Sequence, residues 1–164
     1  MARLAFRSPS KDDVALLSNA LASLARDLGD PFLASETSLR QALFGPCPSA
    51  RARLAERGNR VVGVVLFSPV YSTAQGGAGV YVSDVWVASD LRGENIGRDL
   101  LRDAAQRGAE LWDARFMRLV VHDDNARAAL FYSRLGFAPI DGQSTLALTG
   151  LGFQTLGDRY ESDS

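Results

Sequence analysis

The feature that most constrains the fold is a strand followed by a glycine-bearing turn and an amphipathic helix, at residues 80–112. Residues 80–87, VYVSDVWV, are rich in the β-branched and aromatic side chains that favour a strand. Beyond the turn, apolar residues recur at steps of one, three and four and so gather on one side of a helix. They are Leu100, Leu101, Ala104, Ala105, Gly108, Leu111 and Trp112. The turn between the two elements therefore lies at the start of a helix.

The turn at residues 91–99, LRGENIGRD, has the properties of an anion-binding site. Backbone N–H groups in the first turn of a helix are unpaired, and the positive end of the helix dipole lies there. Gly93 and Gly97 allow an anion to come close, and the guanidinium forks of Arg92 and Arg98 suit phosphate oxygens. The turn is therefore predicted to hold a pyrophosphate.

Residue spacing distinguishes three kinds of phosphate-binding turn. A P-loop requires lysine and then serine or threonine after its last glycine, whereas Gly97 precedes Arg98 and Asp99. A dinucleotide-binding loop requires G-x-G, whereas the next glycine after Gly93 is Gly97. The remaining pattern, [QR]-x-x-[GA]-x-[GA] at residues 92–97, resembles the coenzyme A pyrophosphate loop of the GNAT N-acetyltransferases. The alternative is an ordinary strand-to-helix turn.

Asn95 is the one departure from this pattern, because the family usually has glycine there. Asparagine tolerates the left-handed backbone region better than most residues, but its side chain takes up space beside a ligand. The resemblance implies that the coenzyme contacts the whole turn. The expected contacts are Arg92, Gly93, Glu94, Asn95, Ile96, Gly97 and Arg98.

A second segment, DDNARAALFYSRLGF at residues 123–137, follows a predicted strand at residues 117–122. It resembles the second GNAT signature, N-x-x-A-x-x-F-Y-x-x-x-G-F, with Asn125 opening a helix and Tyr132 in the aromatic pair. Because both signatures occur in order, the chain is identified as a member of the GNAT N-acetyltransferase superfamily. The second signature implies further coenzyme contacts at Asn125, Ala126, Arg127, Ala128 and Tyr132.

The resemblance implies an α/β (α+β) GNAT fold, with a mixed, mostly antiparallel sheet of six to seven strands flanked by about four helices. The expected order is β-α-α-β-β-β-α-β-α-β-β. Strands are expected at residues 4–7, 51–56, 60–67, 80–87, 117–122, 138–140 and 144–149, and helices at about 10–28, 36–44, 100–112 and 125–135. Residues 68–79 are expected to form a mobile loop. Residues 1–157 are expected to be one N-acetyltransferase domain and residues 158–164 a frayed tail.

Composition argues against several classes of partner and site. The 164 residues suffice for one domain, and a net charge of −1 provides no broad basic surface for nucleic acid or an anionic membrane. No apolar run is long enough for a signal peptide or a bilayer span, so a cytoplasmic protein is expected. Cys47 and His122 are the only cysteine and histidine, so no metal is expected, although an all-carboxylate site stays open.

The resemblance also implies a reaction in which a primary amine attacks the thioester of acetyl-CoA directly in a ternary complex. Tyr132 matches the family tyrosine directed at the coenzyme sulfur, and is expected to protonate or stabilise the leaving thiolate. The backbone of Val85, Trp86 and Val87 is expected to bind the pantetheine arm and the developing oxyanion. This role requires an open edge where residues 80–87 splay from residues 117–122.

The proton of the attacking amine needs an acceptor, because a free alkylamine has a pKa near 10. Asp84 lies on the strand beside the presumed thioester and is the candidate base; the alternative is an aspartate with a structural hydrogen bond. His122 has a suitable intrinsic pKa, but a lone histidine is more often structural.

The acceptor is predicted to be a small-molecule amine. The run VYVSDVWVASDLRG followed by IG resembles the diamine (spermidine/spermine) acetyltransferase-like branch of the superfamily. Ser83 replaces an acidic residue of that branch, and its acidic cluster is only partly present as Asp27 and Asp30. A protein amine as acceptor, a non-catalytic acyl-CoA sensor and a purely structural module remain alternatives. The resemblance implies a homodimer, for which the apolar run at residues 146–153 is the expected contact; the alternative is that this run is part of the core.

Overall fold

The structure, a computed structural model, describes residues 3–158 of the chain. These residues form two compact units, with a boundary between Asn125 and Ala126. The first unit contains β1 (Leu4–Arg7), η1 (Lys11–Asp13), α1 (Val14–Leu28), α2 (Glu36–Phe44), β2 (Arg51–Arg57), β3 (Arg60–Ser72), β4 (Gly77–Val87), η2 (Ser89–Leu91), α3 (Ile96–Trp112) and β5 (Met117–Leu119). The second unit contains α4 (Ala126–Arg134) and α5 (Gly150–Gly157).

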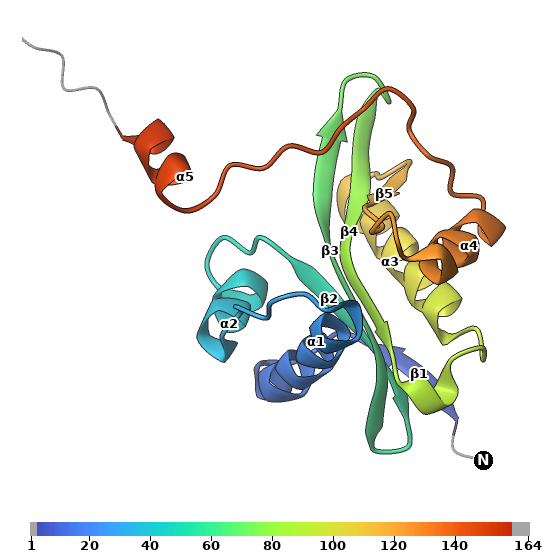
Figure 1. The fold of residues 1–164 in the computed structure, drawn as a ribbon. Coiled ribbons are helices and arrows are strands. Elements are labelled where there is room, and N and C mark those ends of the chain that lie inside the picture. Colours follow the sequence, from blue (N-terminus) through green and yellow to red (C-terminus); the bar gives the residue numbers. More distant parts are fainter. Residues whose placement is uncertain (1–2, 159–164) are drawn as a thin grey trace, which may run out of the picture. The chain divides into compact units, whose positions relative to one another are not determined.

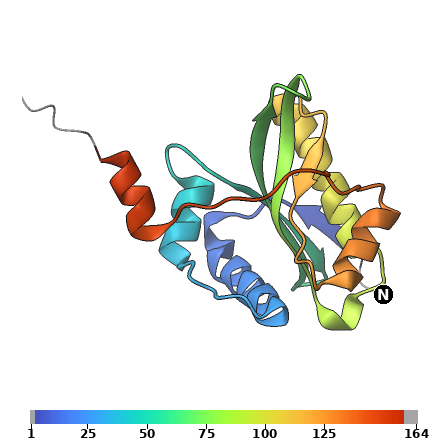
Figure 2. The same ribbon diagram turned by 45° about the horizontal axis from the view of Figure 1, so that its top comes forward.

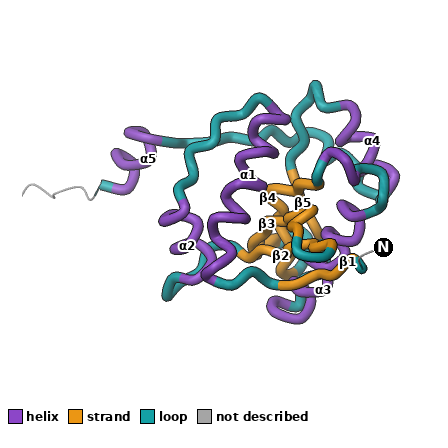
Figure 3. The backbone as a smooth tube through the Cα atoms, turned by 90° about the horizontal axis from the view of Figure 1, so that it is seen from below, coloured by secondary structure: helices purple, strands orange, loops and turns teal. Residues whose placement is uncertain are grey.

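The five strands of the first unit form one mixed sheet, in the order β1-β2-β3-β4-β5. Neighbours from β1 to β4 are antiparallel, whereas β4 and β5 are parallel. Figures 1 and 3 show α1 and α2 on one face of this sheet and α3 on the other. The mixed α/β architecture expected from the sequence is therefore confirmed.

The leucine-rich stripe of α1 forms the core on one face of the sheet. Val14, Leu17 and Leu21 recur at steps of three and four, and none is more than 5% exposed. They belong to one buried cluster with residues of α2, β2 and β3, among them Leu54 and Val64. Burial of this stripe fixes α1 across the sheet.

Two glycines allow α3 to lie close to the other face. A Cβ atom at Gly108 would lie 2.2 Å from Cγ2 of Val80, and one at Gly63 would lie 2.9 Å from Cδ1 of Leu100. Larger side chains at either glycine would therefore push the helix away. The close packing of α3 fixes the position of the turn that precedes it.

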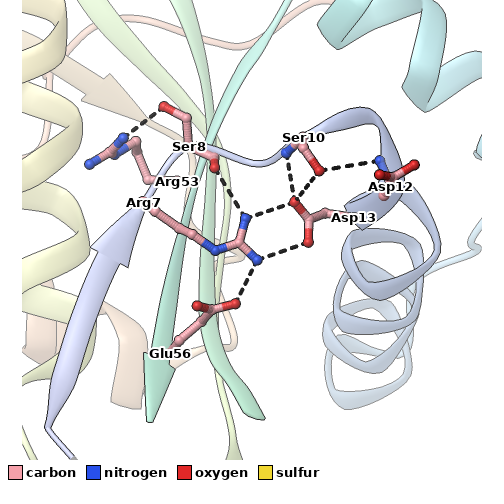
Figure 4. Close-up of polar contacts among 7 residues, drawn as sticks. All are labelled: Arg7, Ser8, Ser10, Asp12, Asp13, Arg53 and Glu56. Atoms are coloured by element: carbon pink, nitrogen blue, oxygen red, sulfur yellow. Dashed lines mark hydrogen bonds and ion pairs between the residues drawn. The ribbon is translucent and has the colours of Figure 1, made fainter. Parts of the chain in front are cut away.

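A charged network ties β1 to the start of the first helical segment and to β2 (Figure 4). The Arg7 guanidinium donates to both carboxylate oxygens of Asp13, at 2.7 and 2.8 Å, and to Glu56 at 2.6 Å. The hydroxyl and the backbone N–H of Ser10 also donate to Asp13, forming a capping box. These contacts, led by the hydrogen bond from Arg7, hold the pKa of the Asp13 carboxyl well below its usual range.

The expectation of a mobile loop at residues 68–79 was wrong. β3 continues to Ser72 and β4 begins at Gly77, so the two strands form one long hairpin (Figure 2). Ser72 pairs with Gly77 and Val70 with Gly79. A β ladder is held by backbone hydrogen bonds, so the small polar residues of this segment do not prevent pairing. Gly79 also lacks the Cβ atom that would lie 2.4 Å from the Phe116 ring.

The expectation of closing strands at residues 138–140 and 144–149 was also wrong. The sheet has five strands instead of six to seven, and the described part of the chain includes a further helix, α5, at Gly150–Gly157. Strands need a partner for their backbone groups, and no ladder involves residues 138–149. Of the expected frayed tail, residues 159–164 lie outside the described residues.

Candidate active site

A β-bulge reshapes the middle of β4. Leu66 of β3 pairs with Asp84, whereas the next residue, Phe67, pairs with Val82. Ser83 is therefore the extra residue on β4, and its hydroxyl donates to the Leu66 carbonyl at 3.2 Å. A bulge of this kind reverses the alternation of a strand beyond it, which re-aims the backbone groups that follow.

The hydrogen bonds on either side of the bulge show this reversal. Before it, the Val80 N–H donates to the Phe116 carbonyl at 2.9 Å, on the β5 side. After it, the Ala88 N–H donates to the Val62 carbonyl at 2.9 Å, on the β3 side. Because strand residues alternate in direction, the N–H and C=O groups of Val85 and Val87 point away from β3, and those of Trp86 point toward it.

The side of β4 toward which Val85 and Val87 point is open. β5 pairs with β4 only at Val80, Tyr81 and Val82, and within residues 3–158 no strand pairs with that side further along. The open edge required by the sequence interpretation is thus present. The side chain of Trp86 packs against the core cluster under α1 and α2, so only its backbone belongs to the edge strand.

The turn before α3 has the backbone geometry of an anion-binding loop. Gly93 and Asn95 both adopt left-handed conformations, with φ of 93° and 64°. The first helical hydrogen bond runs from the Asp99 N–H to the Asn95 carbonyl at 3.0 Å. Asn95 is the N-cap residue, but its side chain makes no capping hydrogen bond. The N–H groups of Ile96, Gly97 and Arg98 precede that bond, and within residues 3–158 they donate to no backbone carbonyl, which is the arrangement that favours a bound anion.

Ile96 is 1% exposed, so its side chain packs beneath the turn and does not face a ligand. A Cβ atom at Gly63 would lie 3.1 Å from Cγ2 of Ile96. The buried isoleucine therefore anchors the turn on the sheet, while Gly93, Glu94 and Asn95 are exposed.

Ion pairs hold the turn, together with Asp90 of η2 just before it, to three other elements of the first unit. Arg92 pairs with Asp27 of α1, and its Nε donates to the Val87 carbonyl at 3.2 Å. Glu94 pairs with an arginine at the end of β2 at 2.6 Å, and Asp90 with one at the start of β3 at 2.7 Å. Sequence reasoning had no signal for these pairs, because their members are far apart in the chain.

Asp84 lies on the same face of β4 as Trp86, two residues further along. Burial raises the pKa of its carboxyl, and a hydrogen bond from Ser83 only partly offsets this effect. Within the described residues 3–158, Asp84 forms no ion pair. A half-buried carboxylate without a cationic partner is a suitable proton acceptor.

Tyr132 lies on α4 in the second unit, between two aromatic neighbours. Its ring is edge-to-face with Phe131, at a centroid distance of 5.1 Å, and with Phe137, at 5.5 Å. Burial raises the pKa of the Tyr132 hydroxyl, so the group stays protonated at neutral pH. In the same helix, Arg127 is exposed in the first turn.

His122 and Asn125, two polar residues singled out in the sequence, lie at the end of the first unit. Nε2 of His122, which follows β5, lies 3.0 Å from Oδ2 of Asp30, which follows α1. The N–H of Asn125 donates to the His122 carbonyl at 2.9 Å. His122 thus links the loops after β5 and α1, which is a structural role for this histidine.

Within residues 3–158, no group of three or more His, Cys, Asp or Glu side chains is placed to hold a metal ion. In the same range, no helix has both the length and the apolar character needed to cross a bilayer.

A family model and a curated relative show the family of this chain, and solved structures share its fold. The sequence model of the acetyltransferase (GNAT) family matches residues 21–137. Thialysine N-epsilon-acetyltransferase from Sus scrofa is 30% identical over 146 residues, which is 83% of this chain and 85% of that protein. A solved integron cassette protein from the mobile metagenome of V. cholerae has a TM-score of 0.76 and 21% identity, covering 97% of this chain and 99% of that one. An aminoglycoside N-acetyltransferase in complex with CoA has a TM-score of 0.74 and 12% identity, covering 92% and 97%.

Proposed function

Since this chain belongs to the acetyltransferase (GNAT) family, we propose that it transfers an acetyl group from acetyl-CoA to a primary amine of a small molecule. The open edge of β4 at Val85 and Val87 is the observation that carries the proposal, because it offers backbone groups to an extended ligand. The name of the Sus scrofa relative supports a small amine as acceptor, since it specifies the N-epsilon group of thialysine.

The turn before α3 is the proposed site for the coenzyme diphosphate. Its left-handed residues Gly93 and Asn95 turn successive N–H groups toward one side, where the helix dipole adds positive potential. Arg92 and Arg98 supply charge, with Glu94, Ile96 and Gly97 contributing backbone. From the second signature we propose contacts by Asn125, Ala126, Arg127 and Ala128 at the start of α4.

The open edge is the proposed site for the acyl end of acetyl-CoA. The pantetheine arm would pair with the backbone of Val85 and Val87, as an added strand pairs with a sheet edge. A backbone N–H on this edge would donate to the thioester oxygen as negative charge develops there. Trp86 contributes only its backbone, which lies between Val85 and Val87, because its side chain packs against the core.

Asp84 and Tyr132 are the proposed proton-transfer groups. Asp84 accepts a proton from the amine, and the amine nitrogen then forms a bond to the thioester carbon. The carbon–sulfur bond breaks, and the Tyr132 hydroxyl donates its proton, or a hydrogen bond, to the leaving thiolate. The second proton that the attacking nitrogen loses restores the Tyr132 phenol, or goes to the thiolate directly, so that the products are a neutral amide and a thiol. The products are an N-acetylated amine and CoA, and no acyl-enzyme forms.

A thiol-release assay across a panel of amines tests the proposal. Purified protein is mixed with acetyl-CoA and thialysine, lysine, spermidine or a peptide with a free N-terminus, and released CoA thiol is measured. We expect amine-dependent release with at least one small amine. Release with the peptide alone would favour a protein acceptor, and coenzyme binding without any release would favour an acyl-CoA sensor.

The remaining features of the proposal concern the whole chain. We propose that residues 1–157 act as one domain, which is supported by a family match that crosses the boundary at residues 125 and 126. We propose a homodimer through residues 146–153 and a cytoplasmic location, where acetyl-CoA is available. The reaction as written requires no metal ion, nucleic acid or membrane.

A further inference from the structure

We propose that Asp27 is a positioning residue of the coenzyme site, acting through Arg92; this inference rests on the proposed function. Asp27 lies in the last turn of α1, 65 positions before Arg92 in the sequence. Its carboxylate pairs with Nη2 of Arg92, while Nε of Arg92 donates to the Val87 carbonyl at 3.2 Å. Two contacts from different nitrogen atoms fix the plane of the guanidinium group.

The Val87 carbonyl lies on the open edge of β4, where the strand gives way to the turn. The N–H of the same peptide, that of Ala88, donates to the Val62 carbonyl at 2.9 Å, so both ends of the Val87–Ala88 peptide are held. With its carbonyl occupied by Arg92, Val87 presents its N–H to a ligand. Arg92 therefore orients the backbone edge to which we assign the pantetheine arm.

Solvent exposure indicates that the Asp27–Arg92 pair serves orientation more than stability. The two side chains are 45% and 32% exposed, and ion pairs this accessible to water contribute little to folding. Within residues 3–158, Arg92 makes no side-chain hydrogen bond besides those to Val87 and Asp27. Its other N–H groups are thus available to a phosphate oxygen. Loss of Asp27 is therefore expected to weaken coenzyme binding without unfolding the protein.

Two other ion pairs hold the same turn and provide a matched control. Asp90 pairs with Arg60 at 2.7 Å, and Glu94 pairs with Arg57 at 2.6 Å. In the described part of the chain, neither arginine donates to a backbone carbonyl of β4. Arg60→Gln therefore removes an anchor of the turn and leaves the contact between Arg92 and Val87 intact.

Calorimetric titration with CoA and steady-state thiol release test the inference on the full chain. For Asp27→Asn we expect the Kd for CoA and the KM for acetyl-CoA to rise roughly tenfold, as for loss of one charged hydrogen-bond partner. We expect kcat and the KM for the amine to stay within about twofold, since neither proposed proton-transfer group is touched. Arg60→Gln is expected to change all these constants by less than about twofold.

The charge-reversed double variant Asp27→Arg/Arg92→Asp separates orientation from simple tethering. It restores an ion pair between α1 and the turn but removes both the hydrogen bond to Val87 and the positive charge that Arg92 offers the diphosphate, so weak CoA binding is expected to persist. Recovery of the original Kd, or an equal loss in Arg60→Gln, would show that any tether suffices and would overturn the inference. So would an unchanged Kd in Asp27→Asn. Wild-type protein that neither binds CoA nor releases thiol would instead overturn the proposed function itself.

Discussion

At the scale of single residues, the two proposed proton-transfer groups have opposite requirements, and burial acts on each in the useful direction. A general base works best when its pKa is close to the pH of the reaction, so that it is ionised but still binds a proton well. The usual pKa of an aspartate is too low for this, and a raised pKa brings it closer. An acid must stay protonated, and a raised pKa keeps the phenol neutral. Burial raises the pKa of both Asp84 and Tyr132.

Removal of the Tyr132 hydroxyl is predicted to slow turnover more than it weakens coenzyme binding. Tyr132→Phe keeps the ring and its edge-to-face contacts but cannot donate to the thiolate, so we expect kcat to fall about a hundredfold. The KM for acetyl-CoA is expected to change by less than about threefold, as measured by thiol release. Tyr71→Phe, at a tyrosine that is 73% exposed, is the control for loss of a phenol. An unchanged kcat in Tyr132→Phe would remove this residue from the mechanism.

Replacement of Asp84 is predicted to change the pH dependence of the reaction. Since burial raises the pKa of Asp84, its protonated form, which cannot act as a base, persists to higher pH than for an ordinary aspartate. The wild-type kcat/KM should therefore fall as pH is lowered, because both Asp84 and the amine become protonated. Asp84→Asn should lower kcat/KM about a hundredfold near neutral pH and leave only the dependence due to the amine.

The conservative variant Asp84→Glu serves as the comparison for this pH profile. A glutamate keeps a carboxylate near the same place, so partial recovery of the rate and of the acid-side dependence is expected. A profile for Asp84→Asn with the wild-type rate and shape would assign Asp84 to structure.

At the scale of elements, the network around Arg7 ties η1 to β1 and β2, two strands that the sheet already pairs. It contacts η1 through Asp13 and β2 through Glu56, while Arg7 belongs to β1. Asp13 is 7% exposed, so its charge needs the partners that it has. The start of the first helical segment is thereby fixed against the edge of the sheet.

Loss of the Asp13 charge is predicted to destabilise the fold in a pH-dependent way. The pKa of Asp13 is lowered in the folded state, so its stabilising contribution is complete above the unfolded pKa near 4 and is lost as pH falls through the folded value. We expect Asp13→Asn to lower the free energy of unfolding by about 2 kcal/mol at neutral pH. The difference from wild type should shrink in urea titrations on the acid side of pH 4.

The neighbouring Asp12 provides the control for this measurement, because it is exposed and forms no ion pair within residues 3–158. Asp12→Asn is expected to leave the free energy of unfolding within about 0.5 kcal/mol of wild type. An Asp13→Asn loss that is equally large at acid and neutral pH would attribute the effect to packing instead of charge.

Elements that carry their own local signal could be predicted from the sequence, whereas features set by pairing could not. The helix at Glu36–Phe44 was predicted with its observed bounds, because Gly45-Pro46 ends it. The bulge at Ser83 depends on register with β3, which no single strand specifies. Residues 138–149 read as strands by their side chains, but a strand also needs a partner.

In the candidate site, too, local features were predictable from the sequence and long-range contacts were not. Glycine spacing and helix onset predict that the turn at residues 91–99 binds an anion, and the left-handed conformation of Asn95 agrees with the tolerance that asparagine has for it. The partner of Arg92 was not predictable, because Asp27 lies on another helix and the contact depends on how α1 crosses the sheet. Long-range ion pairs result from the fold and cannot be predicted from the sequence alone.

At the scale of the whole molecule, an apolar surface on the second unit bears on assembly. Residues 146–156 include several large apolar side chains that are at least half exposed, namely Leu146, Leu148, Leu151, Phe153 and Leu156. Adjacent exposed apolar side chains mark interaction surfaces, since each gains about 1.5–3 kcal/mol on full burial. This surface supports the proposed homodimer.

Charged substitutions on this surface are predicted to convert a dimer into a monomer. Sedimentation equilibrium at micromolar concentration should give a dimer for wild type and a monomer for Leu146→Asp/Leu148→Asp, because each aspartate would have to lose its hydration in the contact. Leu33→Asp, at a leucine that is 89% exposed in the first unit, is the control and should remain dimeric. The melting temperature of the double variant should be independent of protein concentration, whereas that of a wild-type dimer should rise with concentration. A wild-type chain that sediments as a monomer would remove the dimer from the proposal and leave the chemistry assigned to Asp84 and Tyr132 unaffected.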